Sequence, residues 1–128
     1  MKPIRIKKRK EFVAVALNGV SAVTCGLVLQ MLPQTKTGVR IGYTTTKKLG
    51  NAVVRNRIRR RLRALTDTVF KKISVRNGDY VLIGRKASFD RPFHALEKDL
   101  IFAVHEVNRL YRECAKNDVL NQDETTTK

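Results

Sequence analysis

Apolar residues recur at helical spacing in the middle of the chain. They follow one another at steps of four, four, three and four, which at 100° per residue places them on an arc of roughly 80°. The members of this stripe are Val54, Ile58, Leu62, Leu65 and Val69. Asn51 precedes the stripe and can cap a helix by accepting a hydrogen bond from a free backbone N–H. The pattern therefore predicts a helix from about Ala52 to about Lys72 whose stripe faces a core.

An uncharged stretch, residues 12–32, follows a basic arm at residues 1–10. A cationic start before an apolar run is also typical of a signal peptide or a membrane anchor. Polar residues interrupt this run, however, and Asn18-Gly19 favours a break into two elements. The first element is a short helix that ends at Gly19. Its inner face is expected to consist of Phe12, Val15 and Ala16.

Three segments have the patterns of strands. Residues 27–32 place Leu27, Leu29 and Met31 on one side and Val28, Gln30 and Leu32 on the other. Residues 39–44 alternate apolar and polar side chains, as a half-buried strand does. Residues 80–84 are apolar on both sides of the pleat, which is typical of a strand inside a sheet. There is room for one more short strand near residues 21–24.

The last helical pattern begins after Ser88 or Asp90, either of which can cap a helix, with Pro92 tolerated in the first turn. Its inner stripe consists of Phe93, Leu96, Leu100, Ala103 or Val104, Val107, Leu110 and Tyr111. The pattern fails beyond about Arg112, and we expect the polar tail, residues 113–128, to be disordered. Residues 1–112 are expected to form one domain. The order of elements predicts an α+β fold.

Charge is distributed unevenly along the chain. The formal net charge is +16, and residues 1–66 contain 16 Lys and Arg residues against a single acid, Glu11. This asymmetry indicates a nucleic acid or an anionic membrane surface as the partner.

Basic residues are concentrated at the central helix and just before it. Residues 47–63 contain no acid and eight bases, which are Lys47, Lys48, Arg55, Arg57, Arg59, Arg60, Arg61 and Arg63. Like charges at i, i+4 destabilise a helix by roughly 0.2–0.5 kcal/mol per pair, and a solvated helix would intersperse acids. A polyanion would remove the repulsion, and the free N–H groups at the helix start suit a phosphate. The pattern therefore favours a nucleic-acid-binding helix over a solvated one.

Residues that carry chemistry are sparse. The sequence has no Ser-His-Asp or Cys-His arrangement, and its basic half has no acidic cluster that could hold metal ions. Cys25, Cys114, His94 and His105 have no zinc-site spacing, and the cysteines form no Cys-x-x-Cys pair. We therefore expect reduced thiols, a cytoplasmic location, and neither a catalytic residue nor a metal site in the protein.

The run around the arginines resembles a long and specific signature. Its matching residues are Lys47, Lys48, Gly50, Asn51, Ala52, Val53, Arg55, Asn56, Arg57, Arg59 or Arg60, and Arg63. This signature is similar to that of the bacterial ribonuclease P protein subunit, whose hallmark Arg-Asn-Arg stands here at residues 55–57. The resemblance extends from about Lys7 to about Tyr111.

The resemblance implies a single-sheet αβββαβα fold in two layers, similar to a ribosomal-protein domain. It also implies a left-handed βαβ crossover through the arginine helix, whereas about 98% of such crossovers are right-handed. The implied function is that of a subunit of an endoribonuclease that removes the 5′ leader from precursor tRNA. In that family the RNA subunit catalyses, with Mg²⁺ held by RNA and substrate, and the protein assists. The implied partners are the catalytic RNA, in a 1:1 complex, and precursor tRNA, without DNA or membrane.

Two groups of site residues follow from the resemblance. Those expected to contact the catalytic RNA are Lys47, Lys48, Asn51, Arg55, Asn56, Arg57, Arg59, Arg60 and Arg63. Those expected to bind the leader, in a cleft between the first helix and the sheet, are Phe12, Arg9, Gln30 and Arg40. Phe12 matches an aromatic position of the family and is nearly as well explained as a core residue. Ala16 and Gln30 replace further aromatics of many relatives, so leader binding is expected to depend more on charge.

One alternative is a general basic RNA-binding or ribosomal-type chaperone protein that takes no part in cleavage. Such a protein would share the charge but has no reason to carry the Gly-Asn-Ala-Val-x-Arg-Asn-Arg run at residues 50–57. A DNA-binding factor would need a partner helix beside the arginine helix, whereas strands are predicted on both sides of it.

Overall fold

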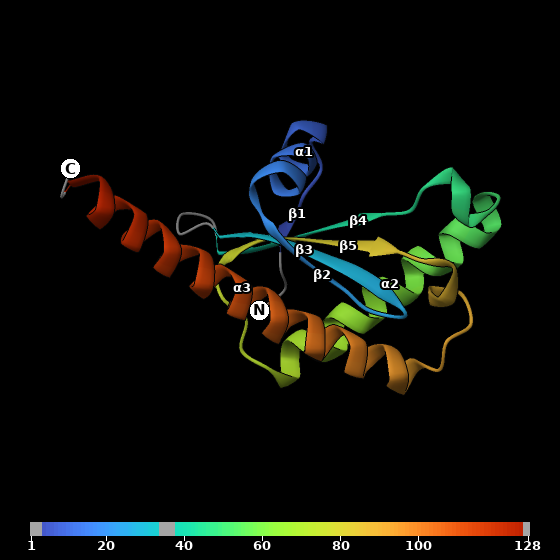
Figure 1. The fold of residues 1–128 in the computed structure, drawn as a ribbon. Helices are drawn as coiled ribbons and strands as arrows, with labels where there is room; N and C mark the ends of the chain where they lie inside the picture. The colour runs from blue at the N-terminus through green and yellow to red at the C-terminus, as the bar shows by residue number, and fades with distance from the viewer. Residues whose placement is uncertain (1–3, 34–37, 127–128) are drawn as a thin grey trace.

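The computed structural model describes residues 4–33 and 38–126, with side chains as far as residue 113. Figure 1 shows how its helices and strands are arranged. The strands are β1 Ile4–Arg5, β2 Val20–Val23, β3 Leu27–Pro33, β4 Val39–Thr44 and β5 Gly78–Gly84. The helices are α1 Arg9–Asn18, α2 Ala52–Lys72 and α3 Phe93–Thr126, with 3₁₀ turns η1 Lys47–Leu49 and η2 Lys86–Ser88. Residues 1–3 of the basic arm and 127–128 of the predicted tail lie outside the described residues.

All five strands form one mixed sheet in the order β1-β4-β5-β3-β2. β4 is parallel to β1 and β5, whereas β3 is antiparallel to β5 and β2. The α+β class and the predicted αβββαβα order are confirmed. α2 connects the adjacent parallel strands β4 and β5, and the left hand of this crossover stays a prediction.

β1 is an addition to the predicted elements, because a strand of two residues is too short to be recognised from its pattern. It pairs with the edge of β4, and the N–H of Ile6 donates to the carbonyl of Ile41 at 2.8 Å. The Ile6 side chain is buried. Part of the arm is therefore built into the sheet.

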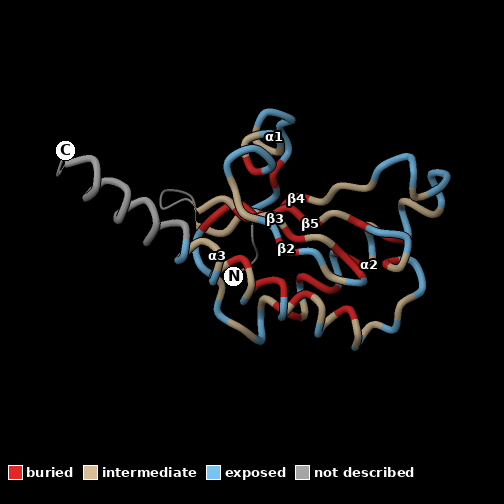
Figure 2. The backbone as a smooth tube through the Cα atoms, viewed as in Figure 1, coloured by how far each residue is buried: buried red, intermediate tan, exposed pale blue. Residues whose placement is uncertain are grey.

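The main core lies between the sheet and the two long helices (Figure 2). The predicted stripe of α2 is buried from Ile58 to Val69, and the stripe of α3 is buried from Leu96 to Val107. On the sheet, these helices cover Leu27, Leu29, Met31, Ile41, Tyr80 and Leu82. The predicted two sides of β3 are confirmed, since Leu27, Leu29 and Met31 are buried in this core and Val28, Gln30 and Leu32 are half-buried.

α1 lies on the other face of the sheet, so the expected two layers gain a third, partial one (Figure 1). Its cluster joins Val15 to Ile6 and Val81, with Phe12 packed against it. Ala16, predicted to be on the inner face of this helix, is exposed. The reason is that Val15 makes the contact with the sheet, and the next residue points about 100° away from it.

The start of α3 differs from the prediction. Ser88 and Asp90 do not cap it, because the carbonyl of Pro92 accepts the first helical N–H bonds, from Ala95 at 3.0 Å and Leu96 at 3.1 Å. The Ser88 hydroxyl is buried, accepts from the N–H of Arg85 and donates to the carbonyl of Gly26. Ser88 therefore fixes η2 against the β2–β3 turn.

The end of α3 also differs, because the helix continues to Thr126. The helix therefore extends past Arg112, where the apolar pattern fails, and the predicted disorder of residues 113–128 stays a prediction. The segment begins with good helix formers, Glu113, Ala115 and Lys116, and adding residues to an existing helix needs no new nucleation. Among the described residues, no helix is both long and apolar enough to cross a membrane.

Candidate nucleic-acid interface

The start of α2 is fixed by its lead-in sequence. The Asn51 side chain accepts a hydrogen bond from the N–H of Val54 at 3.0 Å, which confirms the predicted cap. Gly50 has φ of 144°, a conformation that L side chains rarely adopt. A Cβ there would lie 3.0 Å from the Cβ of Val54. Lys47 and Lys48 are exposed on η1 immediately before this turn.

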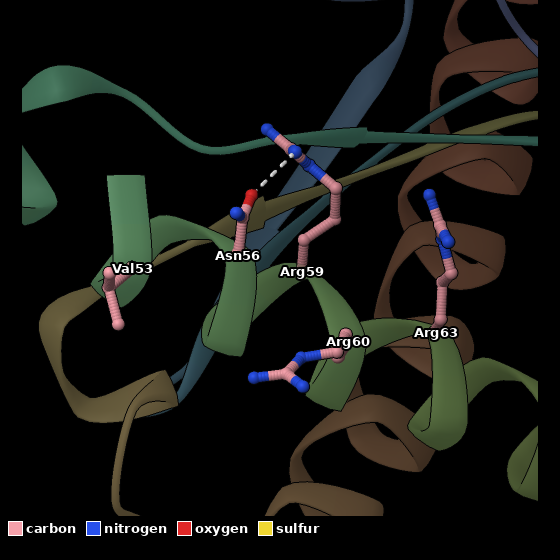
Figure 3. A pocket seen from close by; sticks show the side chains of 5 residues that line it. All are labelled: Val53, Asn56, Arg59, Arg60 and Arg63. Carbon is pink, nitrogen blue, oxygen red and sulfur yellow. Dashed lines mark hydrogen bonds between the residues drawn. The ribbon is translucent and has the colours of Figure 1, made fainter. Parts of the chain in front are cut away.

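One face of α2 forms an outer ridge, which we define as Val53, Asn56, Arg60 and Arg63. Together with Arg59 these residues line an open pocket of about 410 Å³ (Figure 3). Arg60 and Arg63 are exposed. Neither makes a hydrogen bond or an ion pair with any residue in the part of the chain that the structure describes. The ridge therefore presents two unneutralised guanidinium groups.

The flank of α2 that faces β4 is held by the protein. Arg59 donates to the Thr45 hydroxyl at 2.8 Å. It also donates to the Asn56 side-chain oxygen at 3.4 Å (Figure 3). Thr45, one of the threonines that follow β4, therefore positions an arginine. Arg55 stands on the same flank, and its Nε is buried without a hydrogen-bond partner in the described part of the chain.

The opposite flank is bound to the loop between β5 and α3. Arg57 donates from Nε to the carbonyl of Phe89 at 3.1 Å, and its Cζ lies 4.8 Å from the centroid of the Phe89 ring. Arg61 donates to the carbonyls of Ser88, at 2.8 Å, and Arg91. Burial lowers the pKa of Arg61, and the neighbouring Arg57 charge lowers it further. Arg61 is thus a structural member of the basic run.

The two predicted groups of site residues lie on different faces of the sheet. The arginines of α2 are on the face that carries the main core, whereas α1 covers the other face (Figure 1). On that other face the ring of Phe12 lies against β4, where a Cβ on Gly42 would meet it at 2.5 Å. Gln30 is half-buried on β3, between Ser21 and Val81 in the strand register.

Arg40 and Arg9, also predicted to bind the leader, have different surroundings. Arg9 is exposed at the first position of α1. Arg40 forms ion pairs with Glu11 and Asp79. Hydrogen bonding to Asp79 and Glu11 raises the pKa of Arg40, although burial opposes the shift. The charge of Arg40 is therefore neutralised within the protein, which favours a structural role over the predicted leader contact.

Sequence reasoning missed one residue of this interface, Phe89. It is an exposed aromatic stacked on Arg57, and the available signal was its place between polar residues in a loop, Ser88-Phe89-Asp90. The described residues also bring together no group of three or more His, Cys, Asp or Glu side chains that could hold a metal ion. The site consists of arginines, amides and aromatics, which can bind phosphates and bases.

The fold and the arginine helix together define an α+β protein with a strongly basic helical surface, and comparison with known proteins gives the family. A sequence model described as Ribonuclease P matches residues 1–108. The ribonuclease P protein component of Gluconacetobacter diazotrophicus is 50% identical over 97 residues, 75% of this chain and 84% of that protein. That of Paramagnetospirillum magneticum is 41% identical over 113 residues, 84% of this chain and 85% of that protein.

A solved structure agrees with these relatives. The RNase P protein of Thermotoga maritima superposes with a TM-score of 0.67 at 25% identity, over 82% of this chain and 96% of that chain. The chain belongs to the ribonuclease P protein family. It is thus the protein component of a ribonucleoprotein that matures the 5′ ends of tRNAs, and ribonuclease P RNA is its partner.

Proposed function

We propose that α2 binds the ribonuclease P RNA through the outer ridge, in a 1:1 complex, and supports the RNA near the site where precursor tRNA is cleaved. The observation that carries this proposal is the contrast among the arginines of one helix. Arg57, Arg59 and Arg61 donate to protein oxygens, whereas Arg60 and Arg63 are exposed and make no hydrogen bond or ion pair with any described residue. The held arginines orient the helix, and the exposed ones are available to phosphates.

The guanidinium groups of the ridge would act by electrostatics. Each can contact two phosphate oxygens at once, and each phosphate that the protein neutralises releases counterions, so binding becomes salt-dependent. The RNA and its Mg²⁺ ions supply the hydrolysis of the phosphodiester. The protein's part is to reduce repulsion between RNA segments that approach one another in the active complex.

We further propose that the face of the sheet beside α1 receives the single-stranded 5′ leader of precursor tRNA. Phe12, Gln30 and the exposed Arg9 are available there, and Lys7, Lys8 and Lys10 add charge around the start of α1. Arg40 is left out of this group because of its ion pairs. We expect the complex in the cytoplasm. The test is a series of precursor tRNAs with leaders of increasing length, and strong, salt-insensitive leader binding would contradict a charge-based mode.

The decisive experiment is cleavage of 5′-end-labelled precursor tRNA by a bacterial ribonuclease P RNA at low magnesium, with and without the protein, at two salt concentrations. We expect the protein to restore correct cleavage and to do nothing without the RNA. Arg60→Ala combined with Arg63→Ala should weaken the rescue. Lys71→Ala, which removes an exposed charge from the last turn of the same helix, should not. A protein that binds the RNAs tightly but never restores cleavage would be a general RNA-binding protein.

A further inference from the structure

A second pocket lies on the opposite side of Arg60 from the contact between Arg59 and Thr45. It has a volume of about 350 Å³ and is lined by Arg57, Arg60, Arg61, Ala64 and Phe93. It thus combines three guanidinium groups with one aromatic and one small apolar side chain. A phosphate alone would require only the charges, whereas the apolar part indicates a ligand that also has a flat, apolar face.

The Arg57 side chain is held in a form suited to stacking. Its Nε donates to the carbonyl of Phe89 and its Cζ lies over the Phe89 ring, and these two contacts restrain the guanidinium. Arg57 lines the pocket and Phe89 does not, so Phe89 acts on the pocket through Arg57. Unpaired RNA bases stack on arginine planes and on aromatic rings in this way.

The loop that carries Phe89 is held at several points. Arg61 binds the carbonyls on both sides of it, at Ser88 and Arg91. The Ser88 hydroxyl is buried against the carbonyl of Gly26. The Arg91 side chain is paired with Asp99 of α3 at 2.7 Å. The stacked pair is therefore preorganised, and a ligand would not have to order it.

We propose that this pocket binds one unpaired nucleotide of the ribonuclease P RNA. Its base stacks on the Arg57 guanidinium, and its phosphate contacts the exposed guanidinium of Arg60. The inference rests on the proposed function, because Arg60 belongs both to this pocket and to the outer ridge. It adds a contact that depends on a flat surface as well as on charge. Phe89 acts as a positioning residue for Arg57.

The test compares the affinity of the full-length protein for ribonuclease P RNA over a range of salt concentrations. Phe89→Ala should weaken binding by roughly 5- to 150-fold, the range that corresponds to loss of one stacked base, without changing the salt slope. Arg60→Ala should reduce the slope by about one, as expected for a lost phosphate contact. Phe89→Leu should behave like Phe89→Ala, and Phe89→Trp should restore affinity. Arg57→Lys keeps the positive charge but removes the planar guanidinium group, so it should also weaken RNA binding.

The matched control is Phe102→Ala. Phe102 is the other large exposed aromatic among the described residues, 57% exposed on α3 against 36% for Phe89, and its loss should leave RNA affinity unchanged. A direct readout is photo-cross-linking of 4-thiouridine-substituted RNA, which should label the tryptic peptide of residues 87–98. Wild-type affinity of Phe89→Ala and Arg57→Lys, with weak binding by Arg60→Ala, would overturn the inference and leave the proposed function standing.

Two other outcomes are also decisive. A loss in Phe89→Ala that Phe89→Trp does not restore would mean that Phe89 acts only through the loop, and this would overturn the stacking role. Wild-type binding by Arg60→Ala and Arg63→Ala would overturn the proposed function itself.

Discussion

Arg40 and Asp79 face each other across the parallel strands β4 and β5. The guanidinium donates from Nε to Oδ1 at 2.8 Å and from a terminal nitrogen to Oδ2 at 2.6 Å. The same guanidinium pairs with Glu11 of α1. One side chain thus ties two strands to the helix above them, on the face of the sheet away from the main core.

Removal of Arg40 should destabilise the fold. Asp79 is buried, with 1% of its surface exposed, and removing Arg40 breaks a buried ion pair, which costs about 3 kcal/mol or more. Arg40→Ala should lower the free energy of unfolding by this amount in urea titrations. The double variant Arg40→Met, Asp79→Asn should recover part of the loss. A change below about 0.5 kcal/mol in Arg40→Ala would show that the pair is not stabilising, and would return Arg40 to the candidate leader contacts.

The adjacent arginines Arg60 and Arg61 should separate binding from stability. Arg61→Ala removes the donor to two loop carbonyls, and we expect a loss of about 2 kcal/mol in the free energy of unfolding. Arg60→Ala touches no such contact, so its stability should stay within about 0.5 kcal/mol of wild type while its RNA affinity falls. Urea titration and filter binding measure the two effects. Equal losses of stability in both variants would contradict the division of α2 into held and exposed arginines.

Tyr80 gives a prediction at alkaline pH. Its phenol is fully buried and donates to the carbonyl of Arg76 at 2.6 Å. Burial raises its pKa to about 12, whereas an unfolded tyrosine has a pKa of about 10. The unfolded state therefore loses this proton first. The associated stability is fully present below about pH 10 and is lost as the pH rises to about 12.

Tyr80→Phe tests this assignment. At neutral pH the variant should lose about 1 kcal/mol, the value of one hydrogen bond. Its stability should then fall less steeply than that of wild type between about pH 10 and pH 12, because the titrating group is gone. Unfolding followed by circular dichroism at several pH values measures this difference in stability between the variant and wild type. Parallel pH profiles for the two proteins would contradict the raised pKa of Tyr80.

Periodicity predicted most of the fold because each long element has one face in the core. The stripe of α2 and the two sides of β3 follow from residue spacing alone. β1 could not be predicted, because a two-residue edge strand has no period and is formed by pairing with β4. The third layer was not predicted either. α1 contacts the sheet through a single fully buried side chain, Val15, and one buried residue gives no periodic pattern.

The site was predictable as a set of residues but not as an arrangement. Charge density and motif identified the arginines of α2, and helical spacing places Arg61 nearer the apolar stripe than Arg60. The hydrogen-bond partner of Arg61 could not be read from this spacing. That partner is a loop at residues 88–91, about thirty positions away in the chain. The ion pair of Arg40 could not be predicted for the same reason, since its partner Asp79 is distant in sequence and adjacent only in the strand register.

Gly42→Ala tests whether Phe12 binds the 5′ leader of precursor tRNA. A Cβ at Gly42 would lie 2.5 Å and 2.6 Å from two ring atoms of Phe12, closer than carbon atoms can approach, so the ring must move. If Phe12 stacks on a leader base, affinity for a precursor tRNA with a long leader should fall by roughly fivefold or more. Affinity for a tRNA without a leader should stay unchanged.

Phe12→Leu and the double variant Gly42→Ala, Phe12→Leu distinguish an effect on leader binding through the Phe12 ring from a general loss of packing. If Gly42→Ala acts through the Phe12 ring, the double variant should bind the leader no more weakly than Phe12→Leu alone, because the contact is already lost. Overpacking costs about 1–3 kcal/mol, so stability should be followed in the same samples. A Gly42→Ala protein that is less stable but still distinguishes long from short leaders would make Phe12 a core residue only. Leader binding would then depend on the basic side chains around the start of α1, and its salt dependence should be correspondingly steep.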